Sequence, residues 1–480
     1  MPLRRGGGRA AAVGAVAMAL WAAGIVAWGP GAAASSSRHA VSVTQACAGQ
    51  GATGSVHGPA TVSIAYSSDQ EFTTNAKAKL WFTRLKTSFQ RSHPGVTVKL
   101  IPIAGSQTSF IEKIDLMLRS PSTAPDIIHE WTPEVGGQVE AKQLAPLNQY
   151  LAGWKYWKYF PKAVRYGGVP GPGVYQLVSG INDFGLYYDA DQFEQAGLPV
   201  PWQPKTWQTV LSAAQTIQKK VPGTIPFWMY AGNDLYTQVT RENFLPLLQS
   251  TGSPITKGLK WVAKSKGLLA TFSLYHTVFS GGLGPSESDL SNPTATATAD
   301  GTLMPKQKVA IAFVGNWDAS WWVPGGPDPS PAALSAYRVA ALPTEKGQQP
   351  GYASQATGST FVMTCASKHR RLAAQLLELA EGPQFNLLHV LWTGEVPPQT
   401  DLSSNPQYTS HVPYFNKAEN IWFTHATFTP SYNYLSYATC VGQVTGQIEA
   451  SGIGAKTAEQ DFQSCLTHAI GSSGLVTLSG

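Results

Sequence analysis

Charged side chains are scarce in this 480-residue chain. Asp, Glu, Lys and Arg together make up 13% of the residues, which is about half the share usual in soluble proteins. The formal net charge of +6 includes short basic clusters such as Lys219-Lys220 and Lys368-His369-Arg370-Arg371, and a solvated helix face explains both. The basic excess is too small and too scattered for a nucleic-acid-binding surface.

Several catalytic and metal-binding signatures are also missing. The sequence contains no Gly-x-Ser-x-Gly nucleophile elbow, no His-Glu-x-x-His zinc motif and no phosphate-binding loop. Asp189-Ala190-Asp191 lacks the glycine and the distal glutamate of a calcium loop. The 10 histidines form no cluster with metal-ligand spacing. We therefore expect neither a cofactor nor a metal.

Long apolar runs are absent after the N-terminus. Arg4, Arg5 and Arg9 precede an apolar run over residues 10–28, and small residues follow up to Ala34. This order predicts a secretory signal peptide over residues 1–34, with an uncleaved membrane anchor as the alternative. The protein is expected to be exported, and to be extracellular or associated with the cell surface. Residues 35–60 are rich in Ser, Ala and Gly, which predicts a flexible leader.

Cysteine is rare too, with four residues in the chain. Export would allow disulfides to persist. Cys440 and Cys465 each lie in a predicted C-terminal helix, and we predict a disulfide between them, with two buried free thiols as the alternative. Cys365 is expected to be a core residue of a strand. Cys47 begins a small-residue stretch like those that follow the acylated cysteine of bacterial lipoproteins, but Thr44-Gln45-Ala46 is a poor lipobox, so its acylation is left open.

Hydrophobic periodicity predicts an α/β protein. Alternating strand and helix patterns occupy 62–66, 78–89, 96–103, 109–119 and 126–129. This βαβαβ order predicts a mostly parallel sheet with helices on both faces. Strand patterns return at 308–314 and 337–342, and the C-terminal third is helical and aromatic. A chain that crosses more than once between two α/β lobes would produce this order.

A series of short motifs runs along most of the chain. They are Phe89-x-x-x-His93-Pro94-Gly95-Val96, Ala124-Pro125-Asp126-Ile127-Ile128, Gly185-Leu186-Tyr187-Tyr188, Gly315-Asn316-Trp317, Leu342-Pro343-Thr344 and Trp392-Thr393-Gly394-x-x-Pro397. Each motif alone is weak, but their order and spacing are fairly specific. In these motifs the chain resembles the extracellular solute-binding proteins of ABC importers, in the sugar-binding group that includes maltose-binding protein.

The resemblance implies a two-lobed α/β fold of the periplasmic-binding-protein type, with a hinge and a ligand cleft between the lobes. The N-terminal lobe would comprise residues 61–169 and 337–382, and the C-terminal lobe 170–336 and 383–480. The resemblance implies a non-catalytic, monomeric receptor that captures a carbohydrate, in particular an oligosaccharide, by lobe closure. The receptor would then deliver the sugar to the permease subunits of an ABC transporter in the membrane, and no nucleic acid is expected as a partner.

The residues that follow the predicted strands are the first candidates for ligand contact, because ligands of open α/β sheets bind beyond the carboxyl ends of strands. These candidates are Asp69, Glu130, Trp131, Trp317 and Asp318. Sugars suit this mixture, since their CH faces pack on Trp and their hydroxyls bond to carboxylates. Each candidate also has a structural interpretation, as a loop, capping or packing residue.

The resemblance adds four further ligand-binding candidates, which lie in segments that line the cleft in the family. They are Asp183, Asn233, Tyr236 and Trp392. Ligand identity cannot be transferred, because the sequence departs from the family pattern at Asn182-Asp183-Phe184, where other members often carry a more charged stretch.

Two other functions stay open. One is a secreted glycan-active hydrolase in which Glu130 and Asp318 serve as the paired carboxylates. The other is a binding protein for a non-sugar solute, and several carboxylates in the cleft would favour a cation. A hydrolase would consume its ligand, whereas a receptor would return it unchanged.

Overall fold

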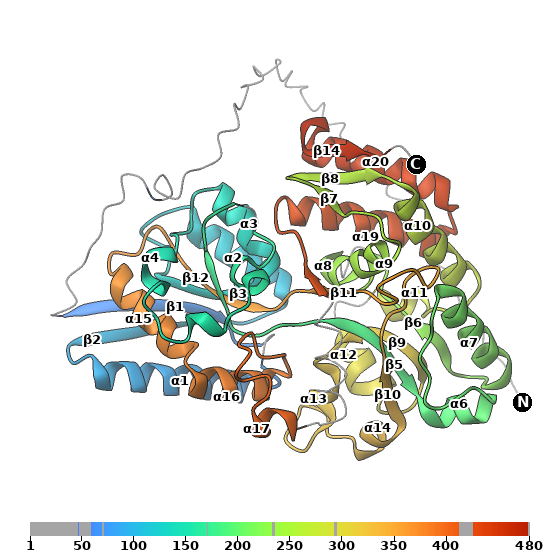
Figure 1. The fold of residues 1–480 in the computed structure, drawn as a ribbon, viewed down its shortest axis with the longest axis horizontal. Coiled ribbons are helices and arrows are strands. Elements are labelled where there is room, and N and C mark those ends of the chain that lie inside the picture. Colours follow the sequence, from blue (N-terminus) through green and yellow to red (C-terminus); the bar gives the residue numbers. More distant parts are fainter. Residues whose placement is uncertain are drawn as a thin grey trace, which may run out of the picture. The chain divides into compact units, whose positions relative to one another are not determined.

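The structure is a computed structural model that describes residues 47, 59–69, 72–169, 171–232, 236–291, 295–411 and 426–478. The predicted signal peptide and most of the predicted leader lie outside the described residues. The described residues form two α/β lobes, each built on its own β-sheet (Figure 1).

The first lobe is built on a five-stranded sheet with the order β2-β1-β3-β12-β4. Its strands are β1 (Ala60–Ser67), β2 (Val96–Ile103), β3 (Ile127–Trp131), β4 (Gln176–Val178) and β12 (Ser359–Met363). β1 pairs in parallel with β2 and with β3, as the βαβαβ pattern predicted. β12 is antiparallel to both of its neighbours, β3 and β4.

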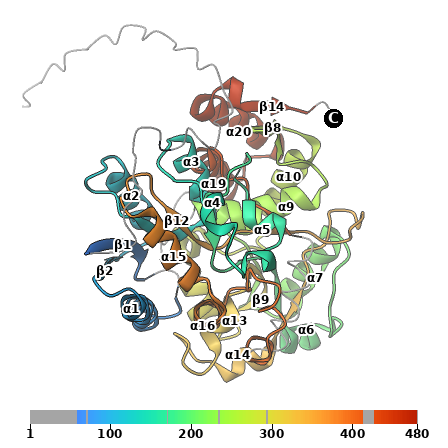
Figure 2. The same ribbon diagram turned by 60° about the vertical axis from the view of Figure 1, so that its left-hand side comes forward.

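Helices cover both faces of the first sheet, because alternate residues of a strand point to opposite sides. Val62 and Ile64 of β1 pack toward α1 (Asn75–Ser92) and α15 (Arg370–Ala380). The neighbouring Ala65 packs toward α2 (Gln107–Leu118) and α3 (Thr132–Glu140). Figures 1 and 2 show these helices around the sheet. The helical pattern predicted at 78–89 lies within α1, where Ala78, Phe82, Leu85 and Phe89 are buried.

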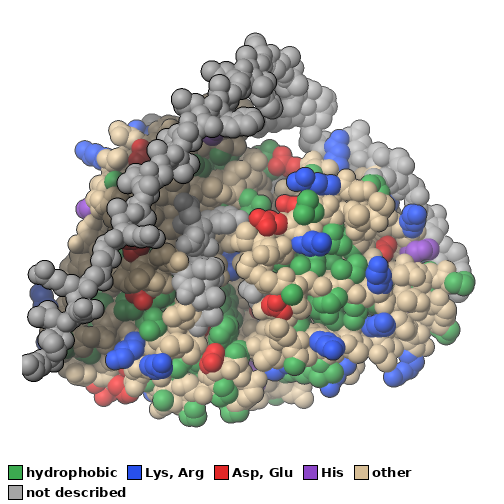
Figure 3. Space-filling view, turned by 180° about the vertical axis from the view of Figure 1, so that it is seen from behind, with side chains coloured by type: hydrophobic (Ala, Val, Ile, Leu, Met, Phe, Trp, Pro, Cys, Tyr) green, Lys and Arg blue, Asp and Glu red, His purple; other side chains and the backbone are tan. Residues whose placement is uncertain are grey.

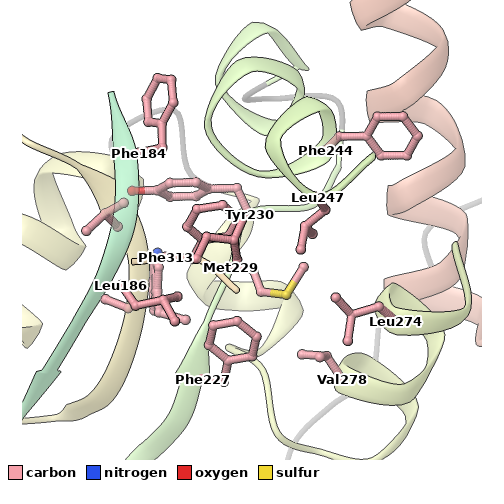
Figure 4. Close-up of a cluster of buried hydrophobic side chains, with 14 of the residues drawn as sticks. Phe184, Leu186, Phe227, Met229, Tyr230, Phe244, Leu247, Leu274, Val278 and Phe313 are labelled. Carbon is pink, nitrogen blue, oxygen red and sulfur yellow. The ribbon is translucent and has the colours of Figure 1, made fainter. Parts of the chain in front are cut away.

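The second lobe is built on a four-stranded sheet with the order β10-β5-β9-β6. Its strands are β5 (Phe184–Asp189), β6 (Ile225–Trp228), β9 (Val309–Gly315) and β10 (Tyr337–Ala340). Every residue of β5 and β9 is buried, as expected for central strands covered on both faces. Figure 4 shows Met229, just after β6, pointing toward Leu274 and Val278 of α10 (Lys266–Ser280).

The remaining elements complete the two lobes (Figure 2). The shorter helices are α4 (Asn148–Leu151), α5 (Lys162–Tyr166), α6 (Ala190–Ala196), α8 (Tyr236–Gln238), α9 (Leu245–Ser250), α11 (Glu287–Leu290), α12 (Ala295–Thr298), α13 (Asp318–Trp322), α14 (Pro331–Ala336) and α17 (Pro406–Thr409). The longer helices are α7 (Trp207–Lys220), α16 (Pro383–Thr393), α19 (Tyr434–Ser451) and α20 (Ala455–Ile470). Two π-helical turns span Val239–Phe244 and Ala299–Leu303, and two 3-10 turns span Trp157–Tyr159 and Ser472–Gly474. Small sheets are formed by β11 (Ser354–Ala356) with β13 (Ala426–Phe428), and by β7 (Thr256–Lys257), β8 (Lys260–Lys264) and β14 (Leu475–Thr477).

Strand pairing corrects the predicted lobe boundaries in two places, and helix packing corrects them in a third. β10 begins the segment 337–382 that was assigned to the N-terminal lobe, but it pairs with β5 of the second sheet. β4 lies within the segment 170–336 assigned to the C-terminal lobe, yet it pairs with β12 of the first sheet. α16 packs on α1 of the first lobe, where the Trp81 indole N–H donates to the Phe385 carbonyl at 3.1 Å. Periodicity reveals a strand or a helix but not its tertiary partner, and the boundaries depend on the partner.

All four cysteines form disulfides. Cys440 and Cys465 are joined and link α19 to α20, which is the pairing favoured from the sequence. Cys365 is buried, as expected of a core residue, although it lies just after β12 and not within it. It is joined to Cys47 across 318 residues, a pairing that was not predicted. In this disulfide the Cys47 sulfur is not available for acylation. The positions of cysteines in a sequence do not determine which of them meet.

The surface carries few charges. On the face seen in Figure 3, charged side chains are scattered among polar and apolar ones, in keeping with their 13% share of the sequence. Among the described residues, no helix has both the length and the apolar character needed to cross a membrane.

Candidate functional site

Asp69 organises the loops that follow the first two strands. Its Oδ1 accepts hydrogen bonds from the Ser68 hydroxyl at 2.7 Å and the Asn75 amide at 3.0 Å, and its Oδ2 accepts from the Gly105 backbone N–H at 2.8 Å. β1 and β2 are parallel, so their carboxyl ends lie at the same edge of the sheet. Asp69 therefore fixes the loop conformation at the edge where ligands of such sheets bind.

Glu130 and Trp131 end β3 and are both buried. The Gln138 amide of α3 donates to Glu130 Oε2 at 2.8 Å, so the helix after the strand covers this carboxylate. The Trp131 ring packs perpendicular to Phe110, with the ring centroids 5.4 Å apart. Trp131 is therefore buried against the first lobe, and its contact with a ligand stays a prediction.

The chain passes between the lobes at residues 179–183 and 341–358, and again after β13, which pairs with β11. The turn after α16 lies against the first of these passages. Ile181 forms a β-bridge with Val396, and Asn182 forms one with Thr357. Several crossing segments therefore meet in one small region, which we call the hinge.

Asn316 ties the hinge to the end of β9. Its side-chain Oδ1 accepts from the Asp183 N–H at 3.1 Å, and its backbone N–H donates to the Asp183 carbonyl at 3.1 Å. Its amide nitrogen donates to the Gly394 carbonyl at 3.0 Å. The Gly-Asn-Trp motif thus holds two hinge segments through one side chain. Asn316 was not among the predicted site residues, although the motif that contains it was identified.

A second group of buried polar side chains lies on the first-lobe side of the hinge. The carboxylate of Glu395 accepts from the Ser359 N–H at 3.1 Å and the Ser359 hydroxyl at 2.7 Å. The Ser179 hydroxyl donates to Ser359 Oγ at 3.1 Å and lies 2.9 Å from His129 Nε2. His389 Nδ1 lies 3.6 Å from Glu395 Oε2. We call these five residues the hinge cluster.

Burial determines the charge of the histidines in the hinge cluster. Desolvation lowers the pKa of His129 to about 3. Desolvation, and after it the neighbouring His129, lowers the pKa of His389 well below its ordinary value. Both rings are therefore neutral at physiological pH. The contact between His389 and Glu395 is consequently not an ion pair, and the cluster is held by its hydrogen bonds.

Asp183 lies at the entrance to the second lobe and is completely buried. Its backbone pairs with Asn316, but within the described residues neither of its carboxylate oxygens has a hydrogen-bond partner. Desolvation raises the pKa of this carboxyl well above its ordinary value. A protonated, neutral carboxyl is the form that such burial favours.

Trp317 and Asp318 follow Asn316 and open α13. The partly exposed Trp317 ring packs perpendicular to Phe184, with centroids 5.9 Å apart. Gly315 makes room for it, because a Cβ at that position would lie 2.1 Å from the Trp317 ring. Asp318 is fully buried. The structure therefore brings Asp183, Trp317 and Asp318 together on the second-lobe side of the hinge.

An acidic cluster of Glu242, Asp300 and Asp318 is buried behind Trp317. Asp300 interacts with Asp318 and with Trp317, and its pKa is raised well above the ordinary value by desolvation and then by Glu242. Desolvation raises the pKa of Glu242 to about 7, although Arg241 opposes the shift. Of this cluster, the sequence pointed only to Asp318.

Arg241 connects this region electrostatically to the first lobe. Its Nη2 lies 3.3 Å from Glu242 Oε1. Desolvation and then Asp115 raise the pKa of Glu134 on α3 to about 8, and Arg241 acts in the opposite direction. Arg241 and Glu242 lie on a π-helical turn, a distortion frequent at functional sites. No periodic pattern of residues predicts a π-helical turn, so both residues were missed in the sequence.

The other candidates lie elsewhere or outside the described residues. Asn233 is outside the described residues, and Tyr236 begins α8 but its side chain is not described. Trp392 lies on the α1 side of the first lobe, where its carbonyl accepts from the Thr73 N–H and hydroxyl, both at 3.0 Å. The guanidinium of Arg84 lies over its ring, 5.5 Å from the centroid.

The arrangement is chemically suited to binding. Among the described residues, no group of three or more His, Cys, Asp or Glu side chains could hold a metal ion. Glu130 and Asp318, the carboxylate pair considered for a hydrolase, lie in different lobes, and both are buried. The hinge instead presents hydrogen-bonding groups and one partly exposed Trp, which are the groups that hold polar ligands in clefts.

Comparison with known families and structures gives a consistent result. Residues 60–386 match the family of bacterial extracellular solute-binding proteins. The fold is similar to that of maltose-bound MalE3 of T. maritima, with a TM-score of 0.69 and 15% identity over 85% of this chain and 99% of that one. It is also similar to the sugar-binding protein MalE of Xanthomonas citri, with a TM-score of 0.69 and 17% identity over 86% and 98% of the two chains.

A third similar structure is the cyclic alpha-maltosyl-1,6-maltose binding protein from Arthrobacter globiformis. Its TM-score is 0.69, with 16% identity over 86% of this chain and 100% of that one. At these identities the likeness concerns the fold, and it confirms the predicted two-lobed α/β architecture.

Proposed function

The chain belongs to the family of bacterial extracellular solute-binding proteins, and from this premise we propose that it is the receptor of an ABC importer for a carbohydrate. It is a binding protein and not an enzyme. The observation that carries the proposal is the position of Trp317, which is partly exposed and fixed beside Asn316, where the chain passes between the lobes. An aromatic face next to buried hydrogen-bonding groups suits a sugar ring and its hydroxyls.

The mechanism is lobe closure around the solute. A ligand stabilises the closed state only to the extent that it contacts both lobes. Trp317 would contact it from the second lobe, and the loops held by Asp69 would contact it from the first. The hinge connects these two surfaces, so the solute would close the lobes without any bond being made or broken. The closed receptor would then be recognised by the permease.

Similar structures support a sugar as the solute. The structures named above carry maltose or are described as sugar-binding or maltosyl-maltose-binding proteins. A further one, from Thermotoga lettingae, contains alpha-D-tagatose. We extend this chemistry to the present chain and propose an oligosaccharide, because two of these similar structures are described with maltose and with a cyclic maltosyl-maltose, which both contain more than one sugar ring.

A second candidate is a solute with a protonated amine. It is favoured by the number of carboxyls buried in and near the acidic cluster, which are Glu134, Glu242 and Asp300; desolvation is the first cause of the raised pKa of each. A bound cation would favour their charged forms and would be attracted by them. An amino sugar combines both chemistries.

We propose that the receptor works outside the cytoplasm, in accordance with the extracellular family. Retention at the membrane would depend on residues 1–34 rather than on lipid at Cys47, because the Cys47 sulfur is joined to Cys365. We further propose that the receptor acts as a monomer, since one chain contains both lobes and the hinge.

The test is a titration with neutral and amino-substituted mono- and oligosaccharides, followed by Trp fluorescence and by analysis of the recovered sugar. We expect a saturable change with intact sugar, and at least tenfold weaker binding by Trp317→Ala, on the scale of one lost aromatic stacking contact. Trp154→Ala is the control, because this Trp packs on Tyr156 and Phe160 within the first lobe.

Cleavage of the sugar would show that the protein is a hydrolase and not a receptor. Binding restricted to amino sugars would select the second candidate. If no saccharide binds, the carbohydrate proposal fails while the family assignment stands.

A further inference from the structure

All charged side chains of the long helix α1 are basic. Its basic residues are Lys77, Lys79, Arg84, Lys86 and Arg91, and it contains no Asp or Glu. Lys79, Arg84 and Arg91 are exposed. Within the part of the chain that the structure describes, none of these three makes an ion pair or a hydrogen bond. An exposed helix usually mixes charges of both signs along its surface, so the outer face of α1 is unusual.

The neighbouring helix α16 is almost without charge. Its sequence is Pro-Gln-Phe-Asn-Leu-Leu-His-Val-Leu-Trp-Thr, and its one titratable residue, His389, is buried and neutral. Its partly exposed apolar side chains are Phe385, Leu387, Leu388, Leu391 and Trp392. On α1, Leu80 is 43% exposed. A basic helix therefore lies beside an apolar one (Figure 1).

A groove of about 520 Å³ lies between the two helices. It is lined by Thr83, Arg84, Thr87, Ser88, Arg91, Gln384, Phe385 and Leu388. Its only charged lining residues are Arg84 and Arg91, which are seven positions apart and so lie on the same side of α1, roughly 10 Å apart along the axis. The volume falls within the range of small-ligand sites. The groove combines two guanidinium groups with apolar side chains from α16.

We propose that this groove binds the phosphate headgroup of an anionic phospholipid and docks the outer face of α1 and α16 on the membrane surface. Guanidinium groups bind phosphate oxygens through paired, charge-assisted hydrogen bonds. Lys79 and Lys86 lie on the other flank of α1 from Arg84 and Arg91, and they add longer-range attraction to a negatively charged bilayer. Phe385 and Leu388 contact the glycerol and upper acyl region of the lipid.

A lipid surface accounts for the exposed apolar residues of this face, whereas a soluble anion does not. Leu80, Leu387 and Leu391 do not line the groove, so a free phosphate in the groove would leave them in contact with water. A bilayer would cover them, as it covers the apolar side of interfacial helices that are basic on their polar side. The docking goes beyond the proposed receptor function and does not depend on which solute the cleft binds.

The experiment measures sedimentation of the exported, ligand-free protein with vesicles. One set contains phosphatidylglycerol and phosphatidylcholine in equal parts, and the other contains phosphatidylcholine alone. We expect binding to the anionic vesicles that disappears at high ionic strength, because salt screens exposed charges. Arg84→Gln with Arg91→Gln should weaken this binding about 30-fold, since each surface cation contributes about a fivefold factor.

The matched control is Lys257→Gln with Lys260→Gln. These exposed lysines flank Leu259, which is 45% exposed on the β7–β8 hairpin, so the control removes the same charge beside an equally exposed leucine. It should bind anionic vesicles like the unchanged protein. Thermal unfolding of both double variants shows whether they are folded.

Two results would overturn the proposal. One is equal sedimentation of the unchanged protein with anionic and neutral vesicles. The other is an equal loss of binding in both double variants, which would show attraction to net charge without use of the groove. Because no solute is present, either failure leaves the proposed receptor function untouched.

Discussion

The two sides of the hinge bury polar side chains in different ways. In the hinge cluster, each carboxylate oxygen of Glu395 accepts a hydrogen bond from Ser359, and a chain of hydroxyls continues to a neutral His129. In the acidic cluster, Asp300 lies near the carboxyls of Glu242 and Asp318, and desolvation and then Glu242 raise its pKa. Paired polar groups fix chain segments to one another, whereas like-charged groups are driven to hold protons.

This contrast separates two roles of buried polarity in one molecule. The hinge cluster connects β4, β12 and the turn after α16, which are far apart in the sequence. Hydrogen bonds join Glu395, Ser359 and Ser179 in series, so the cluster should act mainly on stability and hinge geometry. The acidic cluster lies behind Trp317 and should act mainly on how the second lobe responds to pH.

The largest expected effect is the loss of the Glu395 carboxylate. Glu395→Ala leaves the Ser359 N–H and hydroxyl buried without their acceptor, and each such group costs on the order of 1–3 kcal/mol. We expect the free energy of unfolding to fall by about 3 kcal/mol, measured by urea denaturation. Glu345→Ala is the control, because Glu345 lies 3.3 Å from an exposed Lys346 and such pairs contribute about 1 kcal/mol or less. If both variants lose the same free energy of unfolding, the hinge cluster contributes no more to stability than an exposed ion pair does.

Gly358 tests how closely the hinge segments approach each other. Its φ is +145°, and a Cβ at this position would lie 2.0 Å from the Gly180 carbonyl oxygen. Gly223 also has positive φ, at +81°, but its Cβ would meet nothing within 4 Å. Gly358→Ala should therefore destabilise the protein by about 2 kcal/mol more than Gly223→Ala, the usual scale of overpacking. Similar unfolding midpoints for the two variants would show that the hinge can widen freely.

Much of the fold could be predicted from the sequence, because strands and helices each have a local pattern of hydrophobic residues. The buried stripe of α1 and the parallel β1, β2 and β3 follow from periodicity and from the βαβαβ order. β4 and β10 were placed in the wrong lobes, because only their hydrogen-bond partners reveal where they belong. A three- or four-residue strand carries too little pattern to identify its neighbour.

The candidate site was predicted less completely, for a related reason. The motif that contains Asn316 and Trp317 was recognised, and the structure brings Trp317 together with Asp183 and Asp318 at the hinge. Glu134 and Arg241 escaped notice, because their significance comes from a tertiary approach across the lobe junction. A buried carboxyl looks like any surface carboxyl in a sequence until its burial is known.

The difference between the two clusters can also be tested through the pH dependence of stability, which Asp300 is expected to influence. Its carboxyl has a folded-state pKa raised well above the ordinary value of 3.8, so the folded protein keeps a proton that the unfolded chain has released. Stability is therefore lost as pH rises from about 3.8 toward the raised pKa, by on the order of 1 kcal/mol per pH unit. Asn cannot titrate, so Asp300→Asn should gain stability relative to the unchanged protein as pH rises.

Urea denaturation of both proteins at pH 5 and pH 8 measures this difference. Glu395→Gln provides the comparison from the hinge cluster, where Ser359 donates a hydrogen bond to each carboxylate oxygen, and it should lose stability at both pH values. An advantage of Asp300→Asn that is the same at pH 5 and pH 8 would contradict proton uptake by the acidic cluster.

The smallest expected effect concerns a contact that belongs to neither cluster. Lys77 on α1 donates from Nζ to the Gly325 carbonyl of the second lobe at 2.9 Å and to Thr73 Oγ1 at 2.8 Å. Opening of the lobes would break the bond to Gly325, so this bond favours the closed arrangement. Lys77→Gln should weaken solute binding about fivefold, the equivalent of about 1 kcal/mol for one hydrogen bond. Lys79→Gln is the control, because Lys79 is an exposed residue of the same helix with the same charge. If both variants bind the solute equally, closure is set by the hinge and the solute alone, and the contact at the edge of the lobes contributes nothing to it.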